Sequence, residues 1–411
     1  MAKASIKPHG EGACPHAQQA GRAVAPRPPP LVRLGDVCAH VRGVSYKPRD
    51  ARDEFAAGYV PLLRANNIGE NGLNHDEIVY VKRECVKDFQ FLHPGDLLVC
   101  ASSGSRHLVG KAAQILSDEQ ETFGAFCKVV RPDPQRILPD YLAQYFQSDV
   151  YRRTIANKAA GANINNIRSE HIDDLQIPLP PLPEQKRIAA ILDKICEMKR
   201  NAEASLQKLD LLVKARFVEM FGDARLNDKA WTILNFSNIC RVRQGLQIPI
   251  SDRLAIPEDN CFEYITIAYL HGTKKREYIR NPKPSVVCHK DDVLMTRTGN
   301  TGLVVSNVEG VFHNNFFLID FDKSRFERLF IIHYLNSTFI QGMIQKYAGI
   351  STIPDLNHGD FYRMPIFEPP LALQRQFAAF VEKVEGLKAT AKKELEQVDL
   401  LYRAKLQEFF G

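Results

Sequence analysis

The chain contains two copies of one long sequence unit. Ile177–Leu192 aligns with Ile366–Val381, so residues of the second copy follow their counterparts by 189 positions, and the alignment continues without a gap to Gly222 and Gly411. Upstream of the aligned segment the match loosens, although Gly43 still aligns with Gly245. A repeat of this length indicates duplication of a whole domain and not a solenoid. Identical pairs include Pro181/Pro370, Gln185/Gln374, Ala189/Ala378, Leu206/Leu395 and Asp210/Asp399.

Each copy ends in a segment with the pattern of a long helix. Paired prolines at 180–181 and 369–370 precede it, as expected at a helix start. Apolar residues recur at spacings of three and four, which predicts two helices that pack on each other as a coiled coil. The predicted seam comprises Ile188, Ile191, Ile195, Met198, Ala202, Leu209 and Leu212 in the first copy, where Leu206, Val213 and Phe217 widen the stripe, and Phe377, Phe380, Val384, Leu387, Ala391, Val398 and Leu401 in the second. Ser205 and Glu394 share one seam position and interrupt both patterns. The alternative is that each helix packs only against its own domain.

The segments upstream of the two helices mix short apolar runs with turn residues. Their patterns predict strands at Tyr59–Leu63, Asp96–Cys100, Tyr264–Ile267 and Asp292–Met295, and helices at Asp140–Asn157 and Glu327–Lys346. Scattered Pro and Gly argue against a doubly wound parallel sheet, so we predict α+β domains with a bent, mostly β core. The predicted organisation is a disordered extension at 1–30, a first domain at 31–179, a long helix at 180–222, a second domain at 223–365 and a C-terminal long helix at 366–411.

The composition limits the class of protein. Hydrophobic residues make up 45% and charged residues 25% of the chain, which is typical of soluble globular proteins, and no apolar run is long enough to span a membrane. The nine cysteines include no Cys-x-x-Cys pair, which predicts reduced thiols in a cytoplasmic protein. The net charge of +6 permits a polyanionic partner without requiring one.

The sequence contains no convincing reaction centre. It has neither a phosphate-binding P-loop nor a Gly-x-Gly-x-x-Gly segment after a strand. Asn281–Pro284 is best explained as a proline-rich turn, and Cys288, His289 and His313 lack partners at the spacing of a metal site. We therefore predict no catalytic centre, cofactor or metal in this chain.

Polar loops occur at matching places in both copies, and those of the first pair contain glycine. One pair follows a strand at 102–107 and 296–301, and a second follows a strand at 64–67 and 268–275. Such side chains and backbone amides can contact DNA phosphates and base edges, but ordinary hairpins that need glycine explain the first pair equally well. The predicted DNA-binding residues are Arg64, Asn66, Asn67, Ser102, Ser103, Ser105, Arg106, His107, Tyr269, His271, Lys274, Lys275, Arg297, Thr298 and Asn300. A third pair, at 161–167 and 350–356, has a structural role as an equally good explanation.

The repeated segments resemble the specificity (S) subunits of Type I restriction-modification systems. The resemblance rests on Leu179–Ala190, the helix end Phe217–Gly222, the second pass Pro369–Phe377, the strand Gly95–Leu98 and the segment Gly161–Ile167. It covers nearly everything after residue 30. The second copy departs from the pattern at Ala372-Leu373, where the first has Pro183-Glu184, which changes the helix start and not the architecture.

The resemblance implies a function and a set of partners. Each domain would be a target-recognition domain that reads one half of a bipartite site in double-stranded DNA, and the helices would form an antiparallel coiled coil that sets the spacing and docks modification (methyltransferase) subunits. S-adenosylmethionine, ATP and Mg are expected on the modification and restriction subunits. A pseudo-two-fold chain with unlike readers should read an asymmetric site, because identical readers read palindromes. The alternatives are a duplicated scaffold without DNA specificity and an orphan adenine methyltransferase. The family's base-reading residues vary with the target, so none is assigned by motif.

Overall fold

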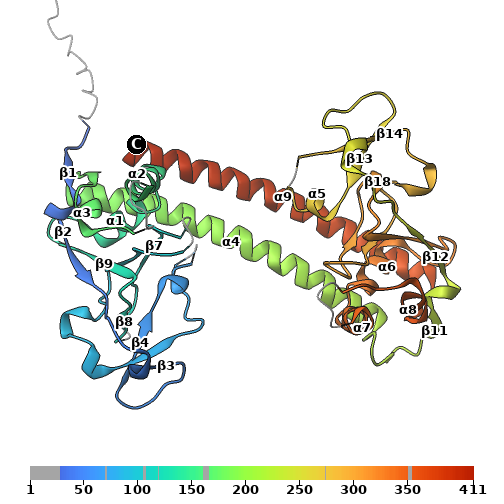
Figure 1. The fold of residues 1–411 in the computed structure, drawn as a ribbon, viewed down its shortest axis with the longest axis horizontal. Coiled ribbons are helices and arrows are strands. Elements are labelled where there is room, and N and C mark those ends of the chain that lie inside the picture. The colour runs from blue at the N-terminus through green and yellow to red at the C-terminus, as the bar shows by residue number, and fades with distance from the viewer. Residues whose placement is uncertain are drawn as a thin grey trace, which may run out of the picture. The chain divides into compact units, whose positions relative to one another are not determined.

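The computed structural model describes residues 28–69, 72–104, 108–118, 120–160, 166–273, 275–349 and 354–411, without the side chains of residues 159 and 160. The chain divides into two compact units (Figure 1). Unit 1 comprises residues 1–195 and 401–411, and unit 2 comprises residues 196–400. Each of the two long helices, α4 (Leu182–Phe221) and α9 (Leu371–Phe410), therefore contributes to both units. Most of the predicted extension at 1–30 lies outside the described residues.

Unit 1 contains two four-stranded sheets and a short ladder. The first sheet has the order β2 (Cys38–Arg42), β9 (Cys127–Pro132), β6 (Leu97–Cys100), β7 (Ala112–Gln114). The second has the order β3 (Ala51–Arg52), β5 (Val79–Lys82), β4 (Tyr59–Leu63), β8 (Thr122–Phe123). The ladder joins β1 (Leu31–Arg33) to β10 (Gln176–Pro178). The helices are α1 (Pro139–Tyr145), α2 (Asp149–Ala160), α3 (Ser169–Asp173) and the start of α4.

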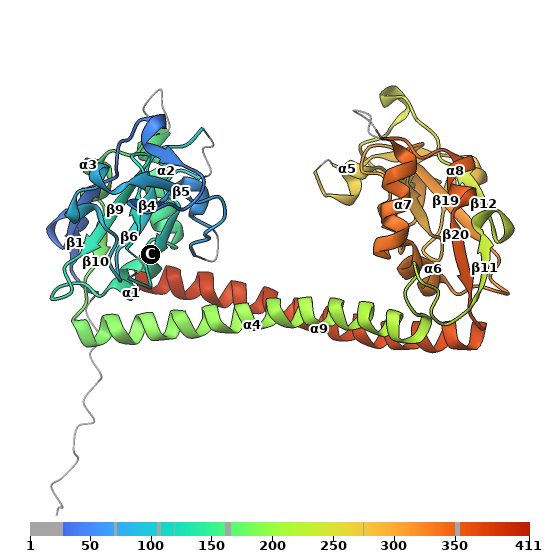
Figure 2. The same ribbon diagram turned by 90° about the horizontal axis from the view of Figure 1, so that it is seen from below.

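Unit 2 also contains two four-stranded sheets and a short ladder, and its second sheet differs from that of unit 1 in one edge strand. Its first sheet has the order β12 (Cys240–Gln244), β19 (Phe316–Phe321), β16 (Leu294–Thr296), β17 (Val304–Val305). The second has the order β14 (Tyr278–Arg280), β13 (Cys261–Ile265), β18 (Gly310–Phe312), β15 (Val287–Cys288). The ladder joins β11 (Thr232–Asn235) to β20 (Pro365–Glu368). The helices are α5 (Ile267–Leu270), α6 (Arg328–Leu335), α7 (Thr338–Ala348), α8 (His358–Arg363) and the start of α9, with α6 next to α9 (Figure 2).

The strand register confirms the duplication. β4 pairs in parallel with β8, with Leu62 opposite Thr122, and β13 pairs in parallel with β18, with Tyr264 opposite Val311. Thr122 and Val311 are counterparts in the repeat. A parallel contact inside otherwise antiparallel sheets is a specific feature, so its presence in both units shows one fold used twice.

Gly43 and Gly245 are needed at equivalent close approaches. A Cβ atom on Gly43 would lie 2.2 Å from the carbonyl oxygen of Gly124, and one on Gly245 would lie 2.3 Å from that of His313. These distances are too short for any side chain, so only glycine fits at either position. Gly124 and His313 are themselves counterparts in the repeat, which confirms the alignment in this loosely matched region.

Two local predictions were wrong. The helices expected at 140–157 and 327–346 are each two helices, because Ser148 and Ser337 begin new ones. The Ser337 hydroxyl caps α7 by accepting from the amide of Ile340, and Ser148 accepts from Tyr151, and a capping serine stabilises a helix start. The strand expected at 264–267 ends at Ile265, where α5 soon follows.

A buried glutamine fixes each long helix to its domain. The Gln185 side chain donates to the carbonyl oxygens of Arg136 (3.0 Å) and Pro180 (2.9 Å) and accepts from the amide of Leu138 (2.8 Å). In unit 2 the Gln374 side chain makes the same three bonds, to Arg325, Pro369 and Glu327, at 3.0, 2.7 and 2.8 Å. Because Gln185 is 1% and Gln374 0% exposed, these bonds satisfy backbone groups that water cannot reach.

The two helices pair in an antiparallel manner within unit 2. The Lys199 ammonium lies 2.8 Å from the Asp399 carboxylate, and the Lys388 ammonium lies 2.5 Å from that of Asp210. From Lys199 to Asp210 along α4, the partner residues on α9 run back from Asp399 to Lys388, so the two helices are antiparallel. Both pairs are partly exposed, so they contribute little free energy but define the register of the helices.

The helix seam differs in part from the predicted one. Met198, Leu212, Leu387 and Leu401 are 45, 48, 59 and 42% exposed, so their assignment to the seam was wrong. The ion pairs Lys199–Asp399 and Lys388–Asp210 identify the face on which the helices meet. The buried or half-buried positions that recur along it at spacings of three and four are Leu192, Ile195, Lys199, Ala202, Leu206, Leu209 and Val213 in α4 and Val381, Val384, Lys388, Ala391, Leu395, Val398 and Tyr402 in α9. Ser205 and Glu394 lie on the exposed face and interrupt nothing in the real seam.

Each domain core is completed by the end of the other copy's helix. In unit 1, Leu406 and Phe410 of α9 are buried with Tyr141, whose ring centroid lies 5.1 Å from that of Phe410. In unit 2 their counterparts in the repeat, Phe217 and Phe221 of α4, are buried with the residues of α6. No helix among the described residues has the length and apolarity needed to span a membrane.

We expect the Gln374→Ala variant to destabilise unit 2. The substitution leaves the buried amide of Glu327 and the carbonyl of Pro369 without partners, at a cost of roughly 1–3 kcal/mol for each group. The fluorescence of Trp231, the only tryptophan of the chain, reports on this unit because its indole N–H donates to the carbonyl of Phe221 (2.8 Å). Urea unfolding followed at Trp231 should show a lower midpoint. The matched control is the exposed neighbour Arg375→Ala, and equal midpoints for both variants would contradict the assigned role.

Candidate nucleic-acid interface

In unit 1 the chain passes from one sheet to the other between β8 and β9. The amide of Gly124 donates to the carbonyl of Leu63 at the end of β4 (2.9 Å). The carbonyl of Phe126 accepts from the amides of Ala101 and Ser102, just beyond the end of β6, at 2.9 and 3.0 Å. The turn between the sheets therefore joins the two loops that the sequence singles out.

The third predicted loop reaches the same place. The amide of Ile167 donates to the carbonyl of Ala101 (2.7 Å), and Ser102 forms a β-bridge with Asn166. All three loop regions of the first copy thus converge. We call this surface the first corner, defined by residues 64–67, 101–103, 124–126 and 166–167.

Unit 2 contains an equivalent second corner, defined by residues 266–270, 297–300, 313–315 and 354–356. The amide of His313 donates to the carbonyl of Ile265 (3.0 Å), and that of Arg297 donates to Asn315 (2.7 Å). The amide of Leu356 in turn donates to the carbonyl of Arg297 (2.9 Å). The backbone frame is therefore the same in both corners, although the side chains on it differ.

In the first corner, Asn67 supports the loop and does not offer its side chain to a ligand. It is 0% exposed; its amide group donates to the carbonyls of Asn74 (3.1 Å) and Asp76 (2.8 Å), and its oxygen accepts from the amide of Arg64 (2.9 Å). This corrects its prediction as a DNA-binding residue, because a buried amide with satisfied bonds cannot reach a base.

The other predicted residues of the first corner lie at or near the surface. Asn66 is exposed, Arg64 is half-buried and donates to the carbonyl of Glu77 (2.8 Å), and Ser102 and Ser103 are half-buried. Ser105, Arg106 and His107 lie outside the described residues. Asn66 and the edge of Arg64 therefore remain available for contact with a partner.

In the second corner, Arg297 is held inside the fold. Its guanidinium forms two hydrogen bonds with the Asp355 carboxylate (3.0 and 2.7 Å) and lies 5.5 Å from the ring centroid of Phe317, and its side chain is 17% exposed. The Thr298 hydroxyl donates to the same carboxylate (2.8 Å). Partial burial would raise the pKa of Asp355, but the bonds from Arg297 and Thr298 outweigh it and the pKa lies below its ordinary value. Arg297 and Thr298 therefore fix the shape of this corner.

The remaining predicted residues of unit 2 differ in exposure. His271 and Lys275 are exposed in the turn after α5, and Asn300 is exposed at the tip of its loop. The Tyr269 hydroxyl donates to the Glu263 carboxylate, which also binds the Arg276 guanidinium. The hydroxyl proton of Tyr269 is therefore used in a contact within unit 2. Lys274 lies outside the described residues.

Sequence reasoning missed the turns at the centre of both corners. Phe126 is 71% exposed in the first, and His313 is half-buried in the second. Burial lowers the pKa of His313, and the positive charge of Arg253 lowers it further, which favours a neutral imidazole at pH 7. Exposed Arg42 adjoins Gly43 at the first corner. The pattern of strand, glycine and aromatic residue at 122–126 was the available signal.

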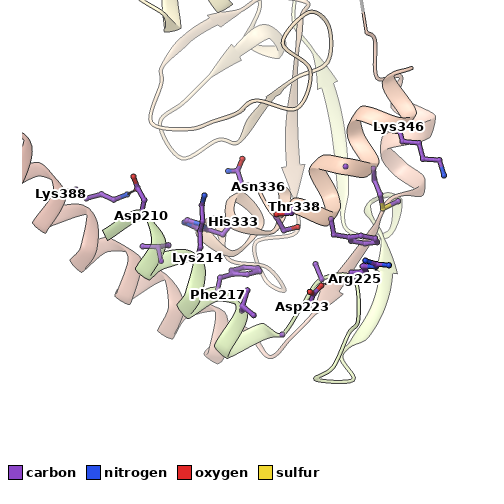
Figure 3. A pocket seen from close by; sticks show the side chains of 18 residues that line it. Asp210, Lys214, Phe217, Asp223, Arg225, His333, Asn336, Thr338, Lys346 and Lys388 are labelled. Atoms are coloured by element: carbon purple, nitrogen blue, oxygen red, sulfur yellow. Dashed lines mark hydrogen bonds and ion pairs between the residues drawn. The ribbon is translucent and has the colours of Figure 1, made fainter. Parts of the chain in front are cut away.

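A cleft of about 1030 Å³ in unit 2 lies away from the second corner (Figure 3). Its lining combines apolar side chains such as Phe217 with Lys388, whose ammonium is bound by Asp210 and Glu385. Burial lowers the pKa of His333 in this cleft to about 4, with a further contribution from Lys388. The described residues contain no group of three or more His, Cys, Asp or Glu that could hold a metal ion.

Comparison with known proteins gives a consistent result. The model of the "Type I restriction modification DNA specificity domain" family matches residues 30–211 and again 228–399. The chain is 28% identical over 390 residues to the type I restriction enzyme StySPI specificity subunit of Salmonella potsdam, covering 88% of this chain and 83% of that one. It is 37% identical over 199 residues to the EcoKI specificity subunit of Escherichia coli (strain K12), covering 48% and 42% of the two chains.

Solved structures share the fold. A chain from a type I restriction-modification system is 18% identical, with a TM-score of 0.58 over 94% of this chain and 99% of that one. The S subunit of such a system from M. genitalium is 15% identical, with a TM-score of 0.56 over 96% and 98%. Because the family model matches most of the chain in two separate passes, the protein belongs to the type I restriction-modification DNA specificity family, whose domain it carries twice.

Proposed function

We propose that this chain is the specificity subunit of a type I restriction-modification complex and reads a bipartite DNA site. The observation that carries the proposal is the pair of corners, in which one backbone frame presents two different sets of side chains. Each corner would contact one half of the site with its exposed polar residues. Base edges are read by such side chains, while phosphate contacts fix the position of the protein on the duplex.

The two halves of the site should differ in sequence. Phe126 of the first corner has Asn315 as its counterpart in the second, and Arg64 at the end of β4 has Thr266 at the end of β13. Dimeric readers with identical recognition surfaces read palindromes. Unlike corners on one frame therefore favour an asymmetric site.

Chemistry is assigned to partner subunits. In our proposal the modification subunits carry S-adenosylmethionine and methylate adenine, and the restriction subunits carry ATP and Mg. The proposal is supported by the two matched family domains, which are described as DNA specificity domains, and by the names of the similar proteins, which are specificity subunits. The chain itself would position these activities without taking part in bond making.

The long helices are proposed as the docking surface for the modification subunits. Three exposed apolar positions recur on both helices at the offset of the repeat: Met198/Leu387, Leu211/Leu400 and Leu212/Leu401. Their exposed fractions range from 42 to 67%. Single exposed apolar residues are common, but the recurrence of the same exposed positions on both helices supports a protein-binding surface and would provide two equivalent contacts.

Selection from a pool of random duplexes tests the DNA proposal. The full chain in complex with its modification subunit should enrich two short defined sequences separated by a spacer of fixed length and free sequence. Binding to the selected duplex should fall steeply with salt. Failure to enrich any sequence would favour the duplicated scaffold, and methylation by the purified chain alone would favour the orphan methyltransferase.

We expect Lys275→Ala to weaken DNA binding on all sequences alike. Lys275 is exposed beside the second corner, and loss of one phosphate contact should reduce the salt slope of binding by about one. The control is Lys290→Ala. Lys290 is also exposed, but it precedes β16, whereas the second corner follows that strand. Anisotropy titrations at several salt concentrations give the slope, and an identical loss in both variants would rule out a specific contact at Lys275.

Charge substitutions on the helices test the docking surface. Leu211→Glu and Leu400→Glu should abolish binding of the modification subunit while the chain stays folded, because these side chains are 62 and 67% exposed. Lys208→Glu and Gln397→Glu are matched controls at exposed counterpart positions on the same helices. Size-exclusion chromatography of the mixed subunits measures the outcome. Normal assembly of both leucine variants would show that docking occurs elsewhere.

A further inference from the structure

Phe126 is an exposed aromatic residue on a rigid turn. Its side chain is 71% exposed, and its ring makes no aromatic or cation–π contact with the described residues. Single exposed apolar residues are common, so exposure alone indicates nothing. The surroundings of Phe126 give it meaning, because the turn lies at the meeting point of all three loop regions of the first corner.

The backbone on both sides of the ring is fixed. The carbonyl of Phe126 accepts two amide hydrogen bonds, and the amide of Cys127 donates to the carbonyl of Gly124 (2.9 Å), which closes the turn. The amide of Ala125 also donates to the carbonyl of Val44 (3.0 Å). A side chain presented by a fixed backbone loses little entropy on binding, which favours contact with a ligand.

The second corner shows that the fold does not need an aromatic residue here. Asn315, the counterpart of Phe126, is half-buried, and its carbonyl accepts from Arg297 as that of Phe126 accepts from Ala101. The same turn therefore forms with a polar side chain. The turn therefore does not need the ring of Phe126 in order to form, and packing within unit 1 does not explain why an aromatic residue stands there.

We propose that Phe126 contacts the apolar surface of a base in the half-site that unit 1 reads, an inference that rests on the proposed function. Phenylalanine can pack against a thymine methyl group or insert between neighbouring bases, and both contacts have the same chemistry. Exposed Arg42, next to the close approach of Gly43 to this turn, would neutralise a phosphate nearby. The first half-site would thus be read partly by apolar contact, at a turn where the second corner carries the polar residue Asn315.

The test compares Phe126→Ala with Leu116→Ala in the full chain bound to its modification subunits. Leu116 is 81% exposed and lies beyond β7, toward the opposite end of β6, since Leu97 pairs with Gln114. Fluorescence anisotropy on the selected duplex should show binding by Phe126→Ala weakened about fivefold or more, as expected for loss of an aromatic–base contact. Binding to an unrelated duplex and the salt slope should stay unchanged, because no phosphate contact is lost. Leu116→Ala should bind like the wild type.

Two further arms identify the contact and guard against misfolding. Replacing each thymine of the first half-site by uracil should weaken the wild type and not Phe126→Ala if the ring packs on a methyl group. If the ring inserts between bases, changing one base step should have that differential effect instead. Phe126→Asn introduces the residue that the second corner carries in this turn, so it should fold and show the same loss as Phe126→Ala.

The possible outcomes distinguish failure of the Phe126–base contact from failure of the proposed DNA-reading function. Wild-type affinity in both Phe126 variants would overturn the contact and leave the DNA-reading proposal intact. An equal loss in Leu116→Ala would also overturn it, because the effect would then be general to exposed apolar residues. Absence of sequence-specific binding by the wild-type complex would instead overturn the proposed function.

Discussion

The buried glutamine at the start of each long helix is the interaction on which both units depend. Gln185 bridges the backbone before α4 and the backbone before α1, and Gln374 bridges the backbone before α9 and the backbone before α6, each with three hydrogen bonds. No apolar residue could satisfy these groups, and an unpaired buried amide is costly. The direction in which each helix leaves its domain follows from this contact, together with the antiparallel pairing beyond it.

Antiparallel pairing explains how a duplicated chain forms two complete cores. The end of α4 supplies Phe217 and Phe221 to unit 2, while the end of α9 supplies Leu406 and Phe410 to unit 1. The polar pairs Lys199–Asp399 and Lys388–Asp210 contribute little stability in water, and their value lies in defining one register.

Much of the fold could be predicted from sequence because each element of the repeat occurs in two copies, and a pattern seen in both copies is easier to recognise. The strands at β4 and β6, the long helices and the polar loops were visible as patterns, whereas the convergence of the loops was not. Periodicity could not decide which of two neighbouring apolar stripes forms the seam, so Met198 and Leu387 were misplaced. Arg297 could not be distinguished from an exposed arginine, because its partner Asp355 is distant in sequence. Phe126 follows a strand and a glycine, but this short pattern does not show that the ring is exposed on a fixed turn.

The exchange of helix ends bears on how such a chain could arise. A polypeptide with one copy would begin its own helix on its own domain but would lack the two aromatic or aliphatic side chains that close the core. A second identical polypeptide could provide them, because Phe217 and Phe221 occupy the repeat positions of Leu406 and Phe410. Gene fusion of such a symmetric dimer would keep these core contacts. It also allows the two halves to accumulate different surface residues, so that an ancestral palindromic site can diverge into two half-sites of unrelated sequence.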